Sequence, residues 1–190
     1  MSALDRIEAN WVYGGVLAGV LLLFLAPLLV AGWERPAALA YLTLPIYMLH
    51  QFEEHDDDRF RRFVNGVLGH GRELLTVRAV FVINFLGVWV LLAACLWLVR
   101  LDGAGWAALA GWLLVVNALL HVGQGIALRR YNPGLVTAVV LFLPLGTLTL
   151  VAAWPLATGG LFWVSLAIAG ALHVWILAHV RRALERAPAV

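Results

Sequence analysis

Three histidines in this chain each follow a leucine near the end of a long apolar segment, and each is followed a few residues later by a group of arginines. They are His50, His121 and His173. Ionisable side chains are costly inside membrane hydrocarbon, and those that occur there usually serve a function. Glu53 and Glu54 follow the first histidine at helical spacing, so they share a helix face with it. Histidines and carboxylates that meet in this way can bind a metal ion, so the sequence predicts a metal site inside a membrane.

The composition supports a membrane setting for these residues. Of the 190 residues, 63% are hydrophobic and only 13% are charged, and the mean hydropathy is +0.91. A soluble domain of this length cannot bury so much apolar surface. The sequence therefore predicts an all-α polytopic membrane protein. Cys95 is the single cysteine, which excludes a disulfide framework within the chain.

Six apolar runs are close to the roughly 20 residues that a helix needs to cross hydrocarbon. They cover residues 11–32, 37–52, 79–99, 105–128, 135–155 and 160–180. We predict one transmembrane domain over residues 1–190, a six-transmembrane-helix bundle, with five spans and a re-entrant segment as the alternative. In the stretch 55–78, arginines alternate with Phe60, Phe63 and other apolar residues at helical spacing. This pattern predicts a short cytoplasmic interfacial amphipathic helix.

The arginines predict the orientation of the chain. There is no lysine, and with a cytoplasmic N-terminus only Arg35 and Arg100 of the 13 basic residues fall on the outer side. This bias predicts a multi-pass protein of the inner (cytoplasmic) membrane with both termini in the cytoplasm. The sequence pI of about 9.1 then reflects contact with the lipid bilayer. We expect no nucleic-acid partner, because the arginines reflect the topology in the membrane, and the sequence does not indicate the oligomeric state.

Depth in the membrane brings the polar residues into one layer. All even-numbered runs go from the outer to the inner side, and the second and third histidines lie eight residues before the arginine pairs that end their runs. At about 1.5 Å per residue, this is roughly 12 Å above those arginines. His50 lies six residues before Asp56, roughly 9 Å above that boundary. Polar residues of the neighbouring turns fall in the same layer, namely Asn84, Asn117 and Gln124.

The candidate metal ligands are His50, Glu53, Glu54, His121 and His173. Two histidines with one glutamate, or three histidines, would complete a site. The carboxylate that does not bind the metal, with Glu53 as the candidate, could act as a general base on bound water or orient a ligand. Zinc would favour hydrolysis and iron an oxidative reaction, so we predict a divalent metal, zinc or iron.

Three motifs in order along the chain carry a resemblance to a known family. They are H-Q-F-E-E at 50–54, the further histidine His121, and Y-N-P-G at 131–134. In these motifs the chain resembles the HXXEE family of bacterial membrane proteins, which is defined by the first motif, one further histidine and a Y-x-P-G motif. The resemblance covers most of the chain and implies no activity, because the family has no assigned function. His173 lies outside the three motifs and is a candidate from depth and residue type alone.

The Y-N-P-G motif is typical of a turn, because proline presets φ and glycine accepts a positive one. Tyr131 could also cover the cytoplasmic mouth of the site and offer its hydroxyl there. We therefore count Tyr131 with Glu53 as a candidate catalytic residue.

Three classes of function fit these residues. The leading hypothesis is an integral membrane metalloprotein, a metal-dependent hydrolase or oxidase acting on a lipid or small hydrophobic substrate from the cytoplasmic leaflet, because so little chain lies outside the runs. A proton or metal-ion transporter is the alternative, since histidines and glutamates suit proton relays. The outer half of each run has no ionisable residue, which is unfavourable for a continuous path. The third class is a non-catalytic membrane scaffold in which the polar layer only directs helix packing.

Overall fold

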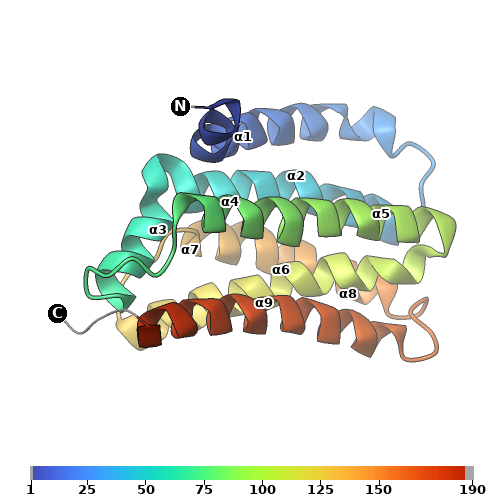
Figure 1. Cartoon of the computed structure of the whole chain (residues 1–190). Helices are drawn as coiled ribbons and strands as arrows, with labels where there is room; N and C mark the ends of the chain where they lie inside the picture. Colours follow the sequence, from blue (N-terminus) through green and yellow to red (C-terminus); the bar gives the residue numbers. More distant parts are fainter. Residues whose placement is uncertain (1, 187–190) are drawn as a thin grey trace.

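The protein is a bundle of long helices that run up and down beside one another. The computed structural model describes residues 2–186, and all regular secondary structure in that range is helical. Figure 1 shows the start of α1 and the end of α9 at the same end of the bundle, where the short helix α3 (Arg59–Phe63) also lies. The long helices are α1 (Ala3–Leu29), α2 (Arg35–His55), α4 (Val77–Asn84) continued by α5 (Leu91–Leu101), α6 (Ala107–Leu128), α7 (Leu135–Thr137) continued by α8 (Leu143–Ala153), and α9 (Leu161–Arg186).

Five of these helical segments are long and apolar enough to cross a membrane. They are Ala3–Leu29, Val77–Leu101, Ala104–Leu128, Leu135–Ala153 and Leu161–Arg186. Helix α2 is not among them, although its 21 residues match the others in length. It packs against α1, α5, α6 and α8, and much of its surface is buried by these helices. A helix that is covered by protein does not need an apolar surface toward lipid, so its polar residues are tolerated, and the six-span count stays a prediction.

Close helix contacts depend on glycine at the places where backbones approach each other. A Cβ at Gly19 of α1 would lie 3.0 Å from the carbonyl oxygen of Pro45 in α2. Gly111 of α6 and Gly146 of α8 face each other, and a Cβ on either would lie 3.1 Å from the other's carbonyl oxygen. Small residues allow this approach, which is the usual way in which membrane helices pack tightly.

Two π-helical stretches interrupt the long helices. Phe85–Val90 joins α4 to α5, and Ala138–Phe142 joins α7 to α8. Such stretches occur frequently at functional sites because they turn side chains out of the α-helical register. The second of them places Phe142 against a histidine of the site described below.

The segment between α2 and α4 folds back over one end of the bundle. Asp57 and Asp58 have positive φ values of 52° and 57° and reverse the chain after α2. Helix α3 continues into a π-helical turn at Val64–Leu68, so the helix predicted within 55–78 is present over part of that stretch. Its apolar side chains pack with Leu75 and with the end of α9, while its location at a membrane surface stays a prediction.

Candidate metal centre

Three buried side chains converge between α2 and α6. One ligand atom from each of His50, Glu54 and His121 lies within 4.8 Å of the other two. The two α2 residues are one helical turn apart, with His50 Nε2 3.5 Å from Glu54 Oε2. His121 approaches from α6, and its Nε2 lies 3.5 Å from Glu54 Oε1. The ring centroids of the two histidines are 5.0 Å apart. Metal-ligand residues predicted from two distant segments are therefore brought together.

The protonation of His50 follows from its contact with Thr137. The Thr137 hydroxyl donates its proton to the Glu53 carboxylate, which can only accept. The same Thr137 oxygen lies 2.8 Å from His50 Nδ1 and has no proton left to give, so it accepts from Nδ1–H. Nε2 of the neutral ring therefore keeps its lone pair. This atom is buried and has no hydrogen-bond partner within residues 2–186.

The protonation of His121 follows in the same way from Asn132. The Asn132 side-chain nitrogen donates to the backbone carbonyl of His121 at 2.9 Å, which fixes the orientation of the amide. Its Oδ1 then lies 2.7 Å from His121 Nδ1 and accepts a hydrogen bond from it. As for His50, Nε2 of the neutral ring keeps its lone pair and is directed toward Glu54.

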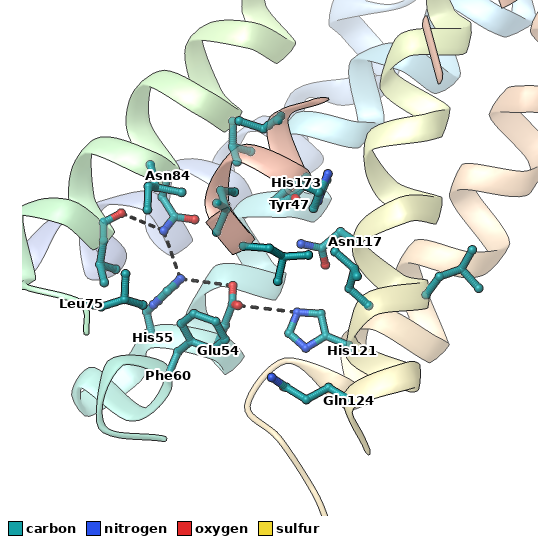
Figure 2. Close-up of a pocket in the computed structure, with 18 of the residues that line it drawn as sticks. Tyr47, Glu54, His55, Phe60, Leu75, Asn84, Asn117, His121, Gln124 and His173 are labelled. Carbon is teal, nitrogen blue, oxygen red and sulfur yellow. Dashed lines mark hydrogen bonds and ion pairs between the residues drawn. The ribbon is translucent and has the colours of Figure 1, made fainter. Parts of the chain in front are cut away.

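Two imidazole lone pairs and a carboxylate are all acceptors, and in a buried site they repel one another unless a cation or a proton lies between them. The two contacts of 3.5 Å are longer than the usual 2.7–3.2 Å of a direct N–H···O hydrogen bond. Two ligand atoms at about 2.1 Å from a tetrahedral zinc ion would lie about 3.4 Å apart. The arrangement therefore suits a shared metal ion better than a direct hydrogen bond. Figure 2 shows two of the three residues, Glu54 and His121.

Gly134, the last residue of the Y-N-P-G motif, lies directly against both imidazoles. Its φ is +95°, which disfavours any residue with a Cβ. A Cβ there would also lie 2.7 Å from His121 Cε1 and 2.8 Å from His50 Cε1. On another side, Phe142 covers the His50 ring, with the centroids 4.2 Å apart. The glycine is therefore required both by the turn and by the close packing of the metal-ligand candidates.

Glu53 points away from the three converging residues. It accepts hydrogen bonds from the Tyr131 hydroxyl at 2.8 Å, from Val136 N at 3.1 Å and from Thr137 N at 2.7 Å. These backbone groups are the free N–H groups at the start of a helix, where a carboxylate is favourable. Partial burial, and then the neighbouring Glu53, raises the pKa of Tyr131 to about 12, so its hydroxyl stays protonated. Glu53 therefore ties the turn after α6 to the end of α2.

Sequence reasoning did not identify Thr137, Asn132 or His55 as parts of the site. Thr137 has no sequence signal, while Asn132 occupies the variable position of the Y-x-P-G motif. His55 is buried at the end of α2 with Nε2 3.1 Å from Glu54 Oε2. A carboxylate only accepts hydrogen bonds, whereas the amide nitrogen of Asn84, 3.2 Å from the same Nε2, only donates, so Nε2 can form one of these two hydrogen bonds but not both.

A network of side-chain amides lies behind His55. The Trp89 indole donates to Gln51 at 2.6 Å, and Gln51 donates to Asn84 Oδ1 at 2.8 Å. Asn84 in turn contacts His55 Nε2 through its side-chain nitrogen at 3.2 Å. Indole nitrogen is a donor only, so it fixes the orientation of the first amide, and each amide fixes the next. Three helices, α2, α4 and the π-helical stretch after it, are thereby joined around the site.

A cavity of about 380 Å³ borders two of the three residues, Glu54 and His121, on the side of α4 and α9. His55 also lies in its wall, and Figure 2 shows His173 on the same cavity, on the side away from Gln124. His173 is buried, and its Nδ1 lies 2.8 Å from the carbonyl oxygen of Ala169 in the same helix. It is thus at the cavity but outside the group of three residues whose ligand atoms lie within 4.8 Å.

The link between Thr137 and His50 gives a first testable prediction. We expect Thr137→Val to weaken zinc binding roughly tenfold to a hundredfold, because the group that orients the His50 ring is lost. Thr137→Ser keeps the hydroxyl and is the matched control, with zinc affinity close to that of the wild type. Competition with a chromogenic chelator measures both. Equal affinities for the valine and serine variants would show that the hydroxyl does not orient the ring.

The comparisons with known proteins agree with the motifs. The chain matches, over residues 41–149, a family model described as "protein of unknown function with HXXEE motif". Searches of curated proteins and of solved structures found no match. The matched range includes the H-Q-F-E-E motif, His121 and the Y-N-P-G motif. The chain, a helical protein with a possible His/Glu metal site, therefore belongs to the HXXEE-motif family.

Proposed function

We propose that the protein is an integral membrane metalloprotein, and that it is a metal-dependent enzyme acting on a lipid or another small hydrophobic substrate. One observation carries this proposal: the Nε2 lone pairs of His50 and His121 converge on the buried carboxylate of Glu54. Their opposite ring nitrogens are held by Thr137 and Asn132, so each imidazole is already oriented to bind a cation.

In this proposal, His50, Glu54 and His121 hold one divalent ion, zinc or iron. Such an ion would polarise a substrate or activate a water molecule if it is zinc, or exchange electrons if it is iron. His173, which the sequence predicts as a further ligand, lies at the same cavity on α9 but outside this group of three residues. The arrangement of two histidines and one glutamate leaves space for a substrate, as catalytic zinc sites do.

We assign Glu53 and Tyr131 to the side of the site that faces the turn 129–134. Glu53 accepts the hydroxyl proton of Thr137 and so holds the group that orients His50. Tyr131 is half exposed, and its hydroxyl donates to the same Glu53 carboxylate. Of the two roles predicted for Glu53, these hydrogen bonds support the orienting role over that of a general base, since its carboxylate oxygens are already occupied.

The cavity supports a hydrophobic substrate. Its wall is mostly apolar and includes Ile83, Val88, Leu172 and Ile176. Leu177 belongs to the same wall and is 54% exposed, so the cavity reaches the outer surface of the bundle beside α9. In a membrane this surface faces acyl chains, from which an apolar molecule could enter.

We further propose six spans, with α2 as the covered second span, in the inner (cytoplasmic) membrane. The start of α1 and the end of α9 lie at the end of the bundle that carries α3 (Figure 1). Apart from Arg35 and Arg100, the arginines belong to segments at that end of the spans. The positive-inside rule then supports a cytoplasmic location for both termini and for the turn 129–134 beside the site.

The experiment for this proposal uses metal-loaded protein in vesicles made from extracted inner-membrane lipids. We expect at least one lipid species to be consumed and a product to form with wild-type protein, and neither change with Glu54→Gln. Mass spectrometry of the whole lipid extract follows both. If metal-loaded wild type changes no species but carries protons or metal ions across the vesicle membrane, the protein is a transporter and the proposed enzyme is wrong.

A further inference from the structure

A second group of polar side chains lies in the cavity, one helical turn from the metal candidates. Tyr47 precedes His50 by three residues on α2, and Asn117 precedes His121 by four residues on α6. His173 reaches the same cavity from α9. All three line this cavity, and Figure 2 shows them on the side of Glu54 away from Gln124. One turn of helix separates this group from the metal candidates by roughly 5 Å along the bundle.

Two of these side chains have acceptors that no protein group uses. Asn117 Oδ1 is buried and has no hydrogen-bond partner among the described residues 2–186. His173 Nδ1 contacts the carbonyl of Ala169, which only accepts, so Nδ1 carries the proton. The other ring nitrogen of His173, Nε2, therefore has a lone pair and is the polar atom left for the cavity. A buried acceptor without a donor is unfavourable, so Asn117 Oδ1 favours a ligand that donates, and His173 Nε2 offers a second acceptor to such a ligand.

The surroundings restrict what that ligand can be. None of the three side chains is a carboxylate, so the group offers no negative charge for a second metal ion or an ammonium group. Tyr47 is nearly fully buried, and the rest of the cavity wall beside His173 is aliphatic. A charged ligand would be poorly solvated here. A neutral donor, such as a hydroxyl or an amide N–H, can bond to one of the two acceptors or share its proton between them, and an apolar chain attached to it can pack against the aliphatic wall.

We propose that Tyr47, Asn117 and His173 form a binding subsite for a neutral hydrogen-bond-donating group, a hydroxyl or amide N–H, of an otherwise apolar substrate. This inference rests on the proposed function, in that the bond that reacts would lie near Glu54, about one helical turn from the donor group. The subsite would select among lipids, because an apolar molecule without a donor leaves Asn117 Oδ1 and His173 Nε2 unpaired. Such recognition by unpaired polar groups is more selective than a purely apolar wall.

The test uses two photoreactive probes that differ only in the donor. One is a dodecanol with a diazirine on its chain, and the other is its methyl ether. Each is added to the detergent-solubilised full-length protein, and the labelled residues of α9 and α6 are found by mass spectrometry. We expect the alcohol to label the cavity roughly two- to tenfold more than the ether, the factor of one net hydrogen bond. Equal labelling by the two probes in wild-type protein would overturn the subsite, and would indicate that water satisfies the two acceptors.

Variants show which residues cause the preference for the alcohol over its methyl ether. We expect Asn117→Leu and His173→Phe each to reduce the preference for the alcohol, and the double variant to lose it. Gln124→Leu is the matched control, because Gln124 lines the same cavity three residues beyond His121, away from the subsite. It should keep the preference. A preference that persists in the double variant would place the donor elsewhere and overturn the assignment.

The metal content of the same samples separates this inference from the proposed function. Equal labelling by both probes in protein that binds metal would overturn the subsite and leave the metal centre intact. A preference for the alcohol in a protein that binds no metal would overturn the metalloenzyme and leave a donor-selective lipid site.

Discussion

Replacing Glu54 by glutamine should abolish metal binding and leave the metal-free protein at least as stable as the wild type. The Glu54 side chain is 8% exposed and lies between His50 and His121. An amide keeps the shape of the carboxylate and removes its charge. Without an ion, the carboxylate is a buried charge beside two lone pairs, which is unfavourable. Residues that hold a functional site commonly reduce the stability of the fold in this way.

Thermal unfolding in detergent, with and without zinc, measures this effect. At a zinc concentration a hundredfold above its dissociation constant, an ion that binds only the folded state stabilises it by about 2.7 kcal/mol. We expect a corresponding rise of the unfolding midpoint for wild-type protein and no rise for Glu54→Gln. Glu73→Gln is the control, since Glu73 is exposed and pairs with Arg61 at the surface. If zinc stabilises Glu54→Gln as much as the wild type, Glu54 is not a ligand.

Replacing Gly134 by alanine should displace the His50 and His121 rings and so disrupt the metal centre. The added Cβ would lie less than 3 Å from carbon atoms of both His50 and His121. Neither ring can move freely, because Thr137 and Asn132 hold them by hydrogen bonds. A positive φ at a residue with a Cβ costs about 1–3 kcal/mol, and overpacking costs about 1–3 kcal/mol more. We therefore expect a clear fall of the unfolding midpoint together with loss of zinc binding.

Gly159→Ala separates the two causes. Gly159 also has a positive φ, of 60°, but a Cβ there would meet nothing within 4 Å. In this control the free energy of unfolding should fall only by the cost of the positive φ, and zinc should bind as in the wild type. If Gly134→Ala lowers stability no more than Gly159→Ala and keeps its zinc affinity, the glycine is required only by the turn and the two rings are not packed as described.

The helical character of the chain and the neighbourhood of its polar residues could be predicted from the sequence. Apolar runs of about 20 residues specify helices strongly because backbone groups in hydrocarbon must be paired within the helix. The spacing of His50 and Glu54 placed them on one face, and the depth argument placed His121 at their level, where the two helices do bring them together. The periodicity and the rise per residue of an α-helix are sufficient to predict which residues share a face and which lie at the same depth.

Apart from Tyr131, the residues around the metal candidates could not be predicted, because they depend on the path of one turn. Asn132 and Gly134 reach the site only because the chain after α6 folds back toward its own axis before α7 begins. The sequence identified this turn but not its direction. Five acidic residues surround His55 in the sequence, which is typical of a solvated loop, yet the helix continues to His55 and buries it against Trp11 and Phe60. Whether a histidine at a helix end is buried or solvated depends on tertiary packing, which the local sequence does not specify.

The most direct test of the account is the metal content of the full-length protein, purified in detergent and measured by mass spectrometry. We expect close to one zinc or iron ion per chain in the wild type, and loss of that ion in His50→Ala and in His121→Ala. His70→Ala is the control, since His70 is exposed in the turn before α4 and should leave the content unchanged. A folded wild-type protein that holds no metal, even after loading with zinc or iron, would contradict the metal centre. Retention of the ion in either of the first two variants would contradict its assigned ligands.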